Sequence, residues 1–240
     1  MSLLSVAGVT KRFGGITANR DVSFEVAPGE LVGIIGPNGS GKSTLFEIIS
    51  GFYRPDAGVV RLDGAPLTGL SPDRVCRLGV ARTFQKLRPF SGLTVVDNVT
   101  VGALTRTRDV RHARARAREL LDRVGLGEKA DAYARTLSTG QRKRLELARA
   151  LATEPRVLLL DEVTGGVDQR SIPGLVQLVR DLHRGGLTLL VIEHNMRVIT
   201  AVAQRILALH LGELIADGTP DAIARDRRVV EAYLGRAYVP

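Results

Sequence analysis

The stretch of this 240-residue chain that decides its fold runs Gly36-Pro37-Asn38-Gly39-Ser40-Gly41-Lys42-Ser43. It fits the phosphate-binding pattern G-x-x-x-x-G-K-[ST] at every position. An apolar run, Leu31–Ile35, comes before it, and a helical pattern, Lys42–Ile49, overlaps its end. The alternative is a glycine-rich turn that matches the pattern by chance, but such a turn would rarely lie between a predicted strand and a predicted helix. The stretch therefore predicts an α/β fold that binds a nucleotide.

The chemistry of phosphate binding explains the residue types in this loop. Glycines let successive backbone N–H groups turn toward phosphate oxygens, and the N-terminus of the following helix adds a positive dipole. Lys42 would contact the β- and γ-phosphates, and the Ser43 hydroxyl would ligate Mg²⁺. The nucleotide-binding residues we expect here are Gly36, Pro37, Asn38, Gly39, Ser40, Gly41, Lys42, Ser43 and Thr44.

A second apolar run delivers two adjacent carboxylates. Val157–Leu160 is followed directly by Asp161 and Glu162, at the carboxyl end of a predicted strand, where ligands bind in sheets of this kind. Asp161 is expected to hold Mg²⁺ through water, and Glu162 to polarise a water for attack on the γ-phosphate. Acids that merely end a strand are the alternative, and the phosphate loop argues against it.

Charge and composition bear on whether the chain binds nucleic acid or lipid and on whether it contains a disulfide. The net charge of +9 suggests nucleic acid or anionic lipid, but the densest basic run, Arg106 to Arg118, alternates with alanine and leads into acidic residues. This pattern favours a solvated helix face, and an aromatic content of 4% leaves few rings to stack bases. The single cysteine, Cys76, excludes an internal disulfide. We expect no nucleic-acid partner.

The sequence also predicts where the chain resides. No apolar run reaches the roughly 18 residues of a membrane helix. The first five residues lack the basic start of a signal peptide. We expect a cytoplasmic protein.

Alternating strand and helix patterns predict the architecture. The apolar runs Leu31–Ile35, Val157–Leu160 and Leu187–Ile192 are typical of buried parallel strands, with helical patterns such as Ile172–Leu182 between them. The opening segments Leu3–Val9 and Val22–Val26 alternate apolar and polar residues, as antiparallel strands do.

The middle and end of the chain differ from this core. From Val95 to Ala152 the pattern is helical almost throughout. After Gly212 it predicts a short strand, a turn at Gly218–Pro220 and a terminal helix through Tyr233. We expect one domain over 1–240, with 1–88 and 155–240 as α/β core and C-terminal tail, and about 89–154 as an inserted helical subdomain.

Leu137-Ser138-Thr139-Gly140-Gln141 brings these features together. It resembles the signature loop L-S-G-G-Q of the ABC ATPases, with Thr139 in place of the first glycine. It ends 20 residues before Asp161 (161 − 141), as in that family. Three further residues match the family in order: Gln85 in the Q-loop, Asp168 in the D-loop and His194 as the switch histidine. The resemblance covers essentially the whole chain, and implies a RecA-like P-loop NTPase core with N-terminal antiparallel strands and a helical insertion.

The resemblance implies how these residues act. Two subunits would dimerise head to tail, so that Ser138, the Gly140 N–H, Gln141 and Asp168 meet the ATP held by the partner. Gln85 would contact Mg²⁺ or the attacking water, and His194 the γ-phosphate and Glu162. Without the resemblance, a lone histidine such as His194 is more often structural. The remaining histidines are expected to be structural; they are His112, His183 and His210.

Phe13 and two departures complete the comparison. Phe13 stands 29 residues before Lys42 (42 − 13), where the family stacks an aromatic ring on adenine; without that precedent it would be a core residue. Val163 follows the catalytic glutamate, where the family usually has proline. Gly165-Gly166-Val167 replaces the commoner Ser-Ala-Leu. Each departure could change the stiffness of its loop and therefore the rate of hydrolysis. A protein that binds nucleotide and signals without turnover therefore stays as an alternative.

Three segments resemble one subfamily, the ATPases of branched-chain amino-acid importers. They are Ala81–Gln85, Ile192–Met196, and the tail from Gly218-Thr219-Pro220 through Ala232–Gly235. A lipopolysaccharide-export ATPase is the nearest alternative, and the Arg-Thr-Phe-Gln block favours the importer. The resemblance implies membrane permease subunits as partners, which hold the chain at the inner face of the membrane. The segment Lys86–Val110 would help to receive a permease helix.

The resemblance does not determine the identity of the second ATPase subunit, which can be a copy of this chain or a related one. In an importer, a substrate-binding protein would also take part, indirectly.

Two other classes with this ATPase head are excluded. Chromosome-maintenance ATPases place a long coiled coil between phosphate loop and signature, whereas Lys42 and Ser138 are 96 residues apart (138 − 42) without sustained heptads. Translation factors of the ABC class carry two cassettes on one chain, and this chain has one.

Overall fold

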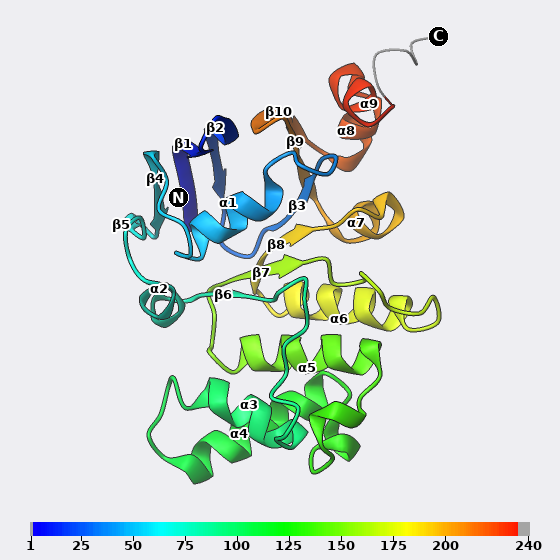
Figure 1. Cartoon of the computed structure of the whole chain (residues 1–240). Helices are drawn as coiled ribbons and strands as arrows, with labels where there is room; N and C mark the ends of the chain where they lie inside the picture. Colours follow the sequence, from blue (N-terminus) through cyan, green and yellow to red (C-terminus); the bar gives the residue numbers. More distant parts are fainter. Residues whose placement is uncertain (1, 235–240) are drawn as a thin grey trace.

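The computed structural model describes residues 2–234 and contains two β-sheets and a set of helices (Figure 1). The larger sheet has six strands in the order β10-β9-β3-β8-β7-β6. Its members are β3 (Leu31–Ile35), β6 (Val80–Arg82), β7 (Val157–Asp161), β8 (Thr188–Ile192), β9 (Arg205–His210) and β10 (Glu213–Gly218). All neighbours pair in parallel except β9 and β10, which are antiparallel. The predicted α/β class is confirmed.

The central strands are apolar because both faces of this sheet are covered. Every residue of β3, β7 and β8 is buried. Alternate residues of β3 enter different cores: Leu31 and Ile35 pack in one cluster, and Val32 and Ile34 in the other. The second cluster includes buried residues of helix α1 (Lys42–Ile49), and the first includes the apolar side of helix α6 (Ile172–Arg184).

The smaller sheet is antiparallel, as predicted, with the order β2-β1-β4-β5. Strands β1 (Leu4–Phe13) and β2 (Ile16–Val26) are longer than the alternating patterns that indicated them. Strand β4 (Ala57–Leu62) pairs with β1, and β5 (Ala65–Pro66) with β4. Helix α2 (Pro72–Leu78) then leads to β6.

Between β6 and β7 the chain is helical, and Figure 1 shows these helices gathered at one end of the molecule, beyond α6. They are α3 (Val95–Ala103), α4 (Val110–Arg123), the 3₁₀ turns η1 (Gly127–Lys129) and η2 (Ala134–Thr136), and α5 (Thr139–Leu151). Three arginines of α4 pair with nearby acids, for example Arg116 with Glu119, and their side chains are exposed; they are Arg114, Arg116 and Arg118. This is the solvated helix face that the sequence predicted. The division of the chain at residues 89 and 154 stays a prediction.

The tail differs in one respect from the expectation. The predicted terminal helix is two short helices, α8 (Pro220–Arg225) and α9 (Arg227–Leu234), because Asp226 adopts an extended backbone between them. Helix α7 (Met196–Val202) precedes β9. Gly235 of the predicted tail motif lies outside the described residues. Within residues 2–234, no helix combines the length and the apolar character needed to cross a bilayer.

Candidate active site

The phosphate loop joins β3 to α1 at the carboxyl edge of the parallel sheet. Gly41 has a φ of 99°, and a Cβ atom there would lie 2.2 Å from the carbonyl oxygen of Ala18. Any other residue would therefore collide with β2 and strain the backbone. The Asn19 amide nitrogen also donates to the Gly41 carbonyl at 3.2 Å. The antiparallel sheet thus supports the loop from outside.

Lys42 is held by its own loop. Its Nζ donates to the carbonyls of Gly36 at 2.7 Å and Pro37 at 2.9 Å, and to Ser40 Oγ at 3.2 Å. Burial lowers the pKa of Lys42, while the negative charges of Glu162 and Asp161 act in the opposite direction. The loop therefore fixes the ammonium group where the carboxylates of β7 face it.

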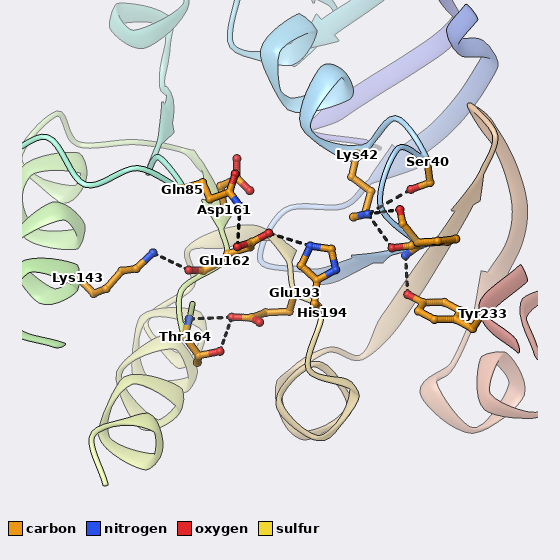
Figure 2. A network of polar contacts seen from close by, with 12 residues as sticks. Ser40, Lys42, Gln85, Lys143, Asp161, Glu162, Thr164, Glu193, His194 and Tyr233 are labelled. Atoms are coloured by element: carbon orange, nitrogen blue, oxygen red, sulfur yellow. Dashed lines mark hydrogen bonds and ion pairs between the residues drawn. The ribbon is translucent and has the colours of Figure 1, made fainter. Parts of the chain in front are cut away.

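Glu162 lies at the centre of a contact network drawn in Figure 2. Its Oε1 is 2.8 Å from His194 Nε2, and its Oε2 accepts a hydrogen bond from Gln85 Nε2 at 3.0 Å. Three segments far apart in sequence thus bring the predicted base, the Q-loop glutamine and the switch histidine together. A cavity of about 620 Å³ is lined by these three residues and by the loop from Asn38 through Thr44.

Asp161 is paired with an arginine whose role the sequence did not reveal. Arg82 Nη2 lies 2.8 Å from Asp161 Oδ2, and Arg82 Nη1 lies 2.9 Å from Glu47 Oε1. The guanidinium also lies over the rings of Phe46 and Phe84. A buried carboxylate needs such a counter-charge. Arg82 belongs to the Arg-Thr-Phe-Gln block that resembles the importer subfamily, but no spacing in the sequence indicated its pairing with Asp161.

The oxygen donors present fit Mg²⁺. Ser43 and Gln85 line the phosphate cavity, and both also line a larger cavity of about 780 Å³ together with Asp161. Within residues 2–234, no cluster of three or more His, Cys, Asp or Glu side chains forms a metal cage. Mg²⁺ needs few protein ligands, because water and substrate phosphates complete its coordination, and the Ser43 hydroxyl, the Asp161 carboxylate and the Gln85 amide oxygen are donors of the kind it binds.

The remaining predicted residues lie outside the phosphate cavity. Ser138 is exposed and caps α5, where its side chain accepts from the Gln141 N–H and Gln141 returns a bond to the Ser138 N–H. The Gly140 backbone, one residue into the same helix turn, packs near Ser171, where an added Cβ would meet the serine at 3.2 Å. Asp168 is exposed and accepts from Ser171, which holds its pKa below the usual value. Ser138 and Asp168 are thus exposed outside the phosphate cavity, Gln141 is half-buried and Gly140 is buried.

Phe13 stands at the end of β1, beside the hairpin residues that line the cavity. It is 42% exposed and contacts the Tyr53 ring edge to face, with centroids 5.2 Å apart. It is therefore not a core residue.

Three contacts around the site were not expected from the sequence. Lys143 Nζ donates to the Glu162 carbonyl at 2.7 Å, the Glu193 carboxylate accepts from Thr164, and Tyr233 Oη accepts from the Gly36 N–H at 2.7 Å (Figure 2). Tyr233 belongs to the tail segment that resembles the ATPases of branched-chain amino-acid importers, but the resemblance did not indicate this contact. Lys143 and Glu193 sit beside predicted residues, but no spacing rule indicated their contacts.

The larger cavity of about 780 Å³, which Ser43, Gln85 and Asp161 line, also lies between the core and the helices before β7. Its lining includes Phe52 and Phe84 from the core side and Val101, Glu146 and Arg149 from the helical side. Arg149 also lies over the ring of Phe90, 4.8 Å from its centroid. The predicted docking segment, 86–110, contributes part of this lining.

Sequence comparison with curated proteins agrees with these motifs. A family model described as ABC transporter matches residues 19–165, and one described as branched-chain amino acid ATP-binding cassette transporter matches residues 213–239. The high-affinity branched-chain amino acid transport ATP-binding protein LivG of Escherichia coli is 38% identical, over 98% of each chain. The lipopolysaccharide export system ATP-binding protein LptB of Acidithiobacillus ferridurans is 36% identical, over 97% of each chain.

Solved structures show the same fold. A nucleotide-free ATP-binding cassette from an ABC transporter is 30% identical with a TM-score of 0.89, over 98% of this chain and all of the other. A dimeric cassette in a post-hydrolysis state, bound to ADP and phosphate, is also 30% identical with a TM-score of 0.81, over 90% of this chain and 98% of the other. The chain belongs to the ABC transporter family and is an ATP-hydrolysing subunit homologous to those of branched-chain amino-acid transport.

Proposed function

We propose that this chain binds ATP with Mg²⁺ as one half of a head-to-tail dimer and powers the import of branched-chain or other hydrophobic amino acids. The observation that carries the catalytic part is the position of Glu162, between Gln85 and His194 and facing the phosphate loop across one cavity. The likeness to LivG along the whole chain, and the tail match at residues 213–239, support the amino-acid cargo.

The residues around the phosphate loop each have a chemical task in this proposal. Loop N–H groups and Lys42 bind the β- and γ-phosphates, while Ser43 and Asp161 would hold Mg²⁺, Asp161 through water. The metal, when bound, neutralises charge on the β- and γ-phosphates. The Glu162 carboxylate accepts a proton from the attacking water. Gln85 and His194 hold the carboxylate from two sides, so that its orientation is set before the nucleotide reacts.

The dimer explains why the signature residues lie outside their own cavity. Ser138 and Gly140 begin α5, whose N-terminus carries a positive dipole suited to an anion. The exposed Ser138 side chain at this end of α5 is available to a γ-phosphate bound by a second subunit, and the buried Gly140 backbone lies two residues further along. The fold likeness to a dimeric cassette bound to ADP and phosphate supports this arrangement. The second subunit can be a copy of this chain or a related ATPase.

The cavity between core and helices offers a place for a membrane partner. It combines apolar side chains from both sides with the charged residues Glu146 and Arg149, which suits an amphipathic cytoplasmic helix of a permease subunit. Docking there would hold the ATPase at the inner face of the membrane. A substrate-binding protein would take part only through the permease.

ATP turnover and mass in solution test the proposal together. The purified chain should release phosphate with Mg²⁺, and Glu162→Gln should lower turnover by roughly 100-fold or more while it traps an ATP-bound dimer. The Gln side chain keeps the size of the glutamate but removes the basic oxygen. A monomeric E162Q chain under saturating ATP would contradict the dimer of identical chains.

The cargo and the alternatives need a second measurement. Reconstitution with the permease subunits of a branched-chain importer should give leucine uptake that E162Q abolishes. Stimulation by the lipopolysaccharide-export permease alone would favour the export system, to which the likeness with LptB points. ATP binding without turnover by the native chain in any assembly would indicate a nucleotide sensor.

A further inference from the structure

Lys143 is a buried lysine that contacts the catalytic segment through the backbone. It lies in the second turn of α5 and is 4% exposed. Its Nζ donates to the Glu162 carbonyl oxygen at 2.7 Å, as Figure 2 shows. An ammonium group is taken out of water only where a strong acceptor meets it. The side chain is therefore committed to this one backbone position.

The backbone of Glu162 needs such support. Its φ is 51°, in the left-handed region that a residue with a long side chain rarely adopts. Its N–H donates to the Ile192 carbonyl at 3.0 Å, and its carbonyl accepts from the Gly165 N–H at 3.2 Å in addition to Lys143. The shortest of these contacts comes from α5. Since the carboxylate is carried by this backbone, a shift of the backbone moves the reacting oxygen atoms.

The helix that carries Lys143 also carries the signature residues. Ser138 caps α5, and Gly140 in its first turn packs near Ser171 of the D-loop side. An α-helix is stiff over so short a distance. A displacement of the capped end of α5 is therefore passed to Lys143 and, through its hydrogen bond, to Glu162 of the same chain.

We propose that Lys143 is a positioning residue that couples the signature end of α5 to the catalytic Glu162 of the same chain. The inference rests on the proposed head-to-tail dimer. In that dimer the signature end contacts the ATP of one site, whereas Glu162 acts at the other site. Lys143 thus makes the geometry of one catalytic carboxylate depend on the nucleotide held at the opposite site.

Substitution of Lys143 separates this role from a structural one. In Lys143→Met, which keeps the apolar stem, kcat should fall by roughly 10- to 100-fold, the effect of displacing a reacting group by about 1 Å. ATP affinity, measured by calorimetry with a non-hydrolysable analogue, should stay within about 2-fold, because the phosphate loop is untouched. Cooperativity of turnover in ATP should weaken, with a Hill coefficient below that of the native chain. Lys143→Arg should restore most of kcat, since it can still donate.

Thr188→Val is the matched control. Thr188 is buried at the other end of β8, where its Oγ1 accepts from the Gly29 N–H at 2.8 Å. This variant also breaks a buried bond between side chain and backbone, so it should lower thermal stability while kcat stays unchanged. If K143M does not fold, Lys143→Gln is measured in the same way, because its shorter amide cannot span the distance that Nζ covers.

The outcomes decide between the alternatives. Native kcat in K143M or K143Q, or a fall in kcat no larger than that of T188V, would overturn the proposal, and so would a parallel loss of ATP affinity. The double variant K143M/E162Q should still form the ATP-trapped dimer, because the signature face is unaltered. If E162Q alone forms no dimer, the head-to-tail dimer of identical chains fails. If E162Q forms the dimer and K143M keeps native kcat and cooperativity, only the role of Lys143 fails.

Discussion

Glu146 is a buried acid whose charge should make the stability of the fold depend on pH. It lies on α5, is 9% exposed, and its Oε1 accepts the Phe84 N–H at 2.8 Å. Burial raises its pKa from 4.5 to about 7, against the opposing effects of the Phe84 hydrogen bond and the charges of Lys143 and Arg149. Each pKa unit is worth about 1.4 kcal/mol, so ionised Glu146 costs the folded state up to about 3 kcal/mol.

The direction of the effect follows from proton binding. The folded pKa lies above the unfolded value, so the folded state binds more protons between pH 4.5 and about 7. The contribution of Glu146 to stability is fully present below pH 4.5 and is lost as the pH rises through about 7. Glu146→Gln removes the charge and keeps an oxygen that can accept the Phe84 N–H. At alkaline pH the variant should therefore be the more stable protein.

Thermal unfolding followed by circular dichroism measures this difference. At about pH 8.5 the Tm of E146Q should exceed that of the native chain by about 6–12 °C, since 1 kcal/mol shifts a domain of this size by about 2–4 °C. Near pH 4.5 the two Tm values should converge. Glu128→Gln, at an exposed position in η1, should follow the native curve throughout. Parallel Tm curves for E146Q and the native chain would refute the assignment of Glu146 as a buried titrating group.

Three further changes test other contacts. Gly41→Ala puts a Cβ atom 2.2 Å from the Ala18 carbonyl, so ATP affinity measured by calorimetry should fall by roughly 10-fold or more; unchanged affinity would show that β2 can yield. Tyr233→Phe leaves the Gly36 N–H without its acceptor and should lower the free energy of unfolding in urea by about 1 kcal/mol, whereas Tyr53→Phe should not. Replacement of Mg²⁺ by EDTA should reduce phosphate release roughly 100-fold, and persistent turnover would argue against a metal-dependent site.

Local patterns were enough to predict the elements that hold the site. The phosphate loop places its strand, turn and helix in consecutive residues, so β3 and α1 were predicted with the bounds that the structure gives them. The strand before Asp161 was predicted one residue short, because its final residue is an acid and an apolar pattern stops before it. Strands β4 and β9 were not predicted, although β9 pairs with β3 beside the loop.

Contacts between distant segments could not be read in the same way. The family resemblance indicated that Gln85, Glu162 and His194 act together, but no pattern indicated which atoms meet. The partner of Asp161 is 79 residues away on β6, and its pairing depends on the register of β6 against β7. Lys143 stands between two arginines at the start of α5, and no spacing in the sequence indicated that it alone would contact Glu162. Such contacts are set by packing, which sequence periodicity does not describe.

The two neighbouring carboxylates differ in what surrounds them, and this difference separates their tasks. Asp161 is buried against the guanidinium of Arg82, a fixed positive charge that holds the carboxylate in place. Glu162 has neutral or titratable neighbours instead, Gln85 and His194, and opens on the phosphate cavity. In the proposed mechanism, the fixed Asp161 carboxylate therefore serves as an oxygen donor to Mg²⁺. The Glu162 carboxylate, held by an amide and an imidazole, would accept the proton of the attacking water.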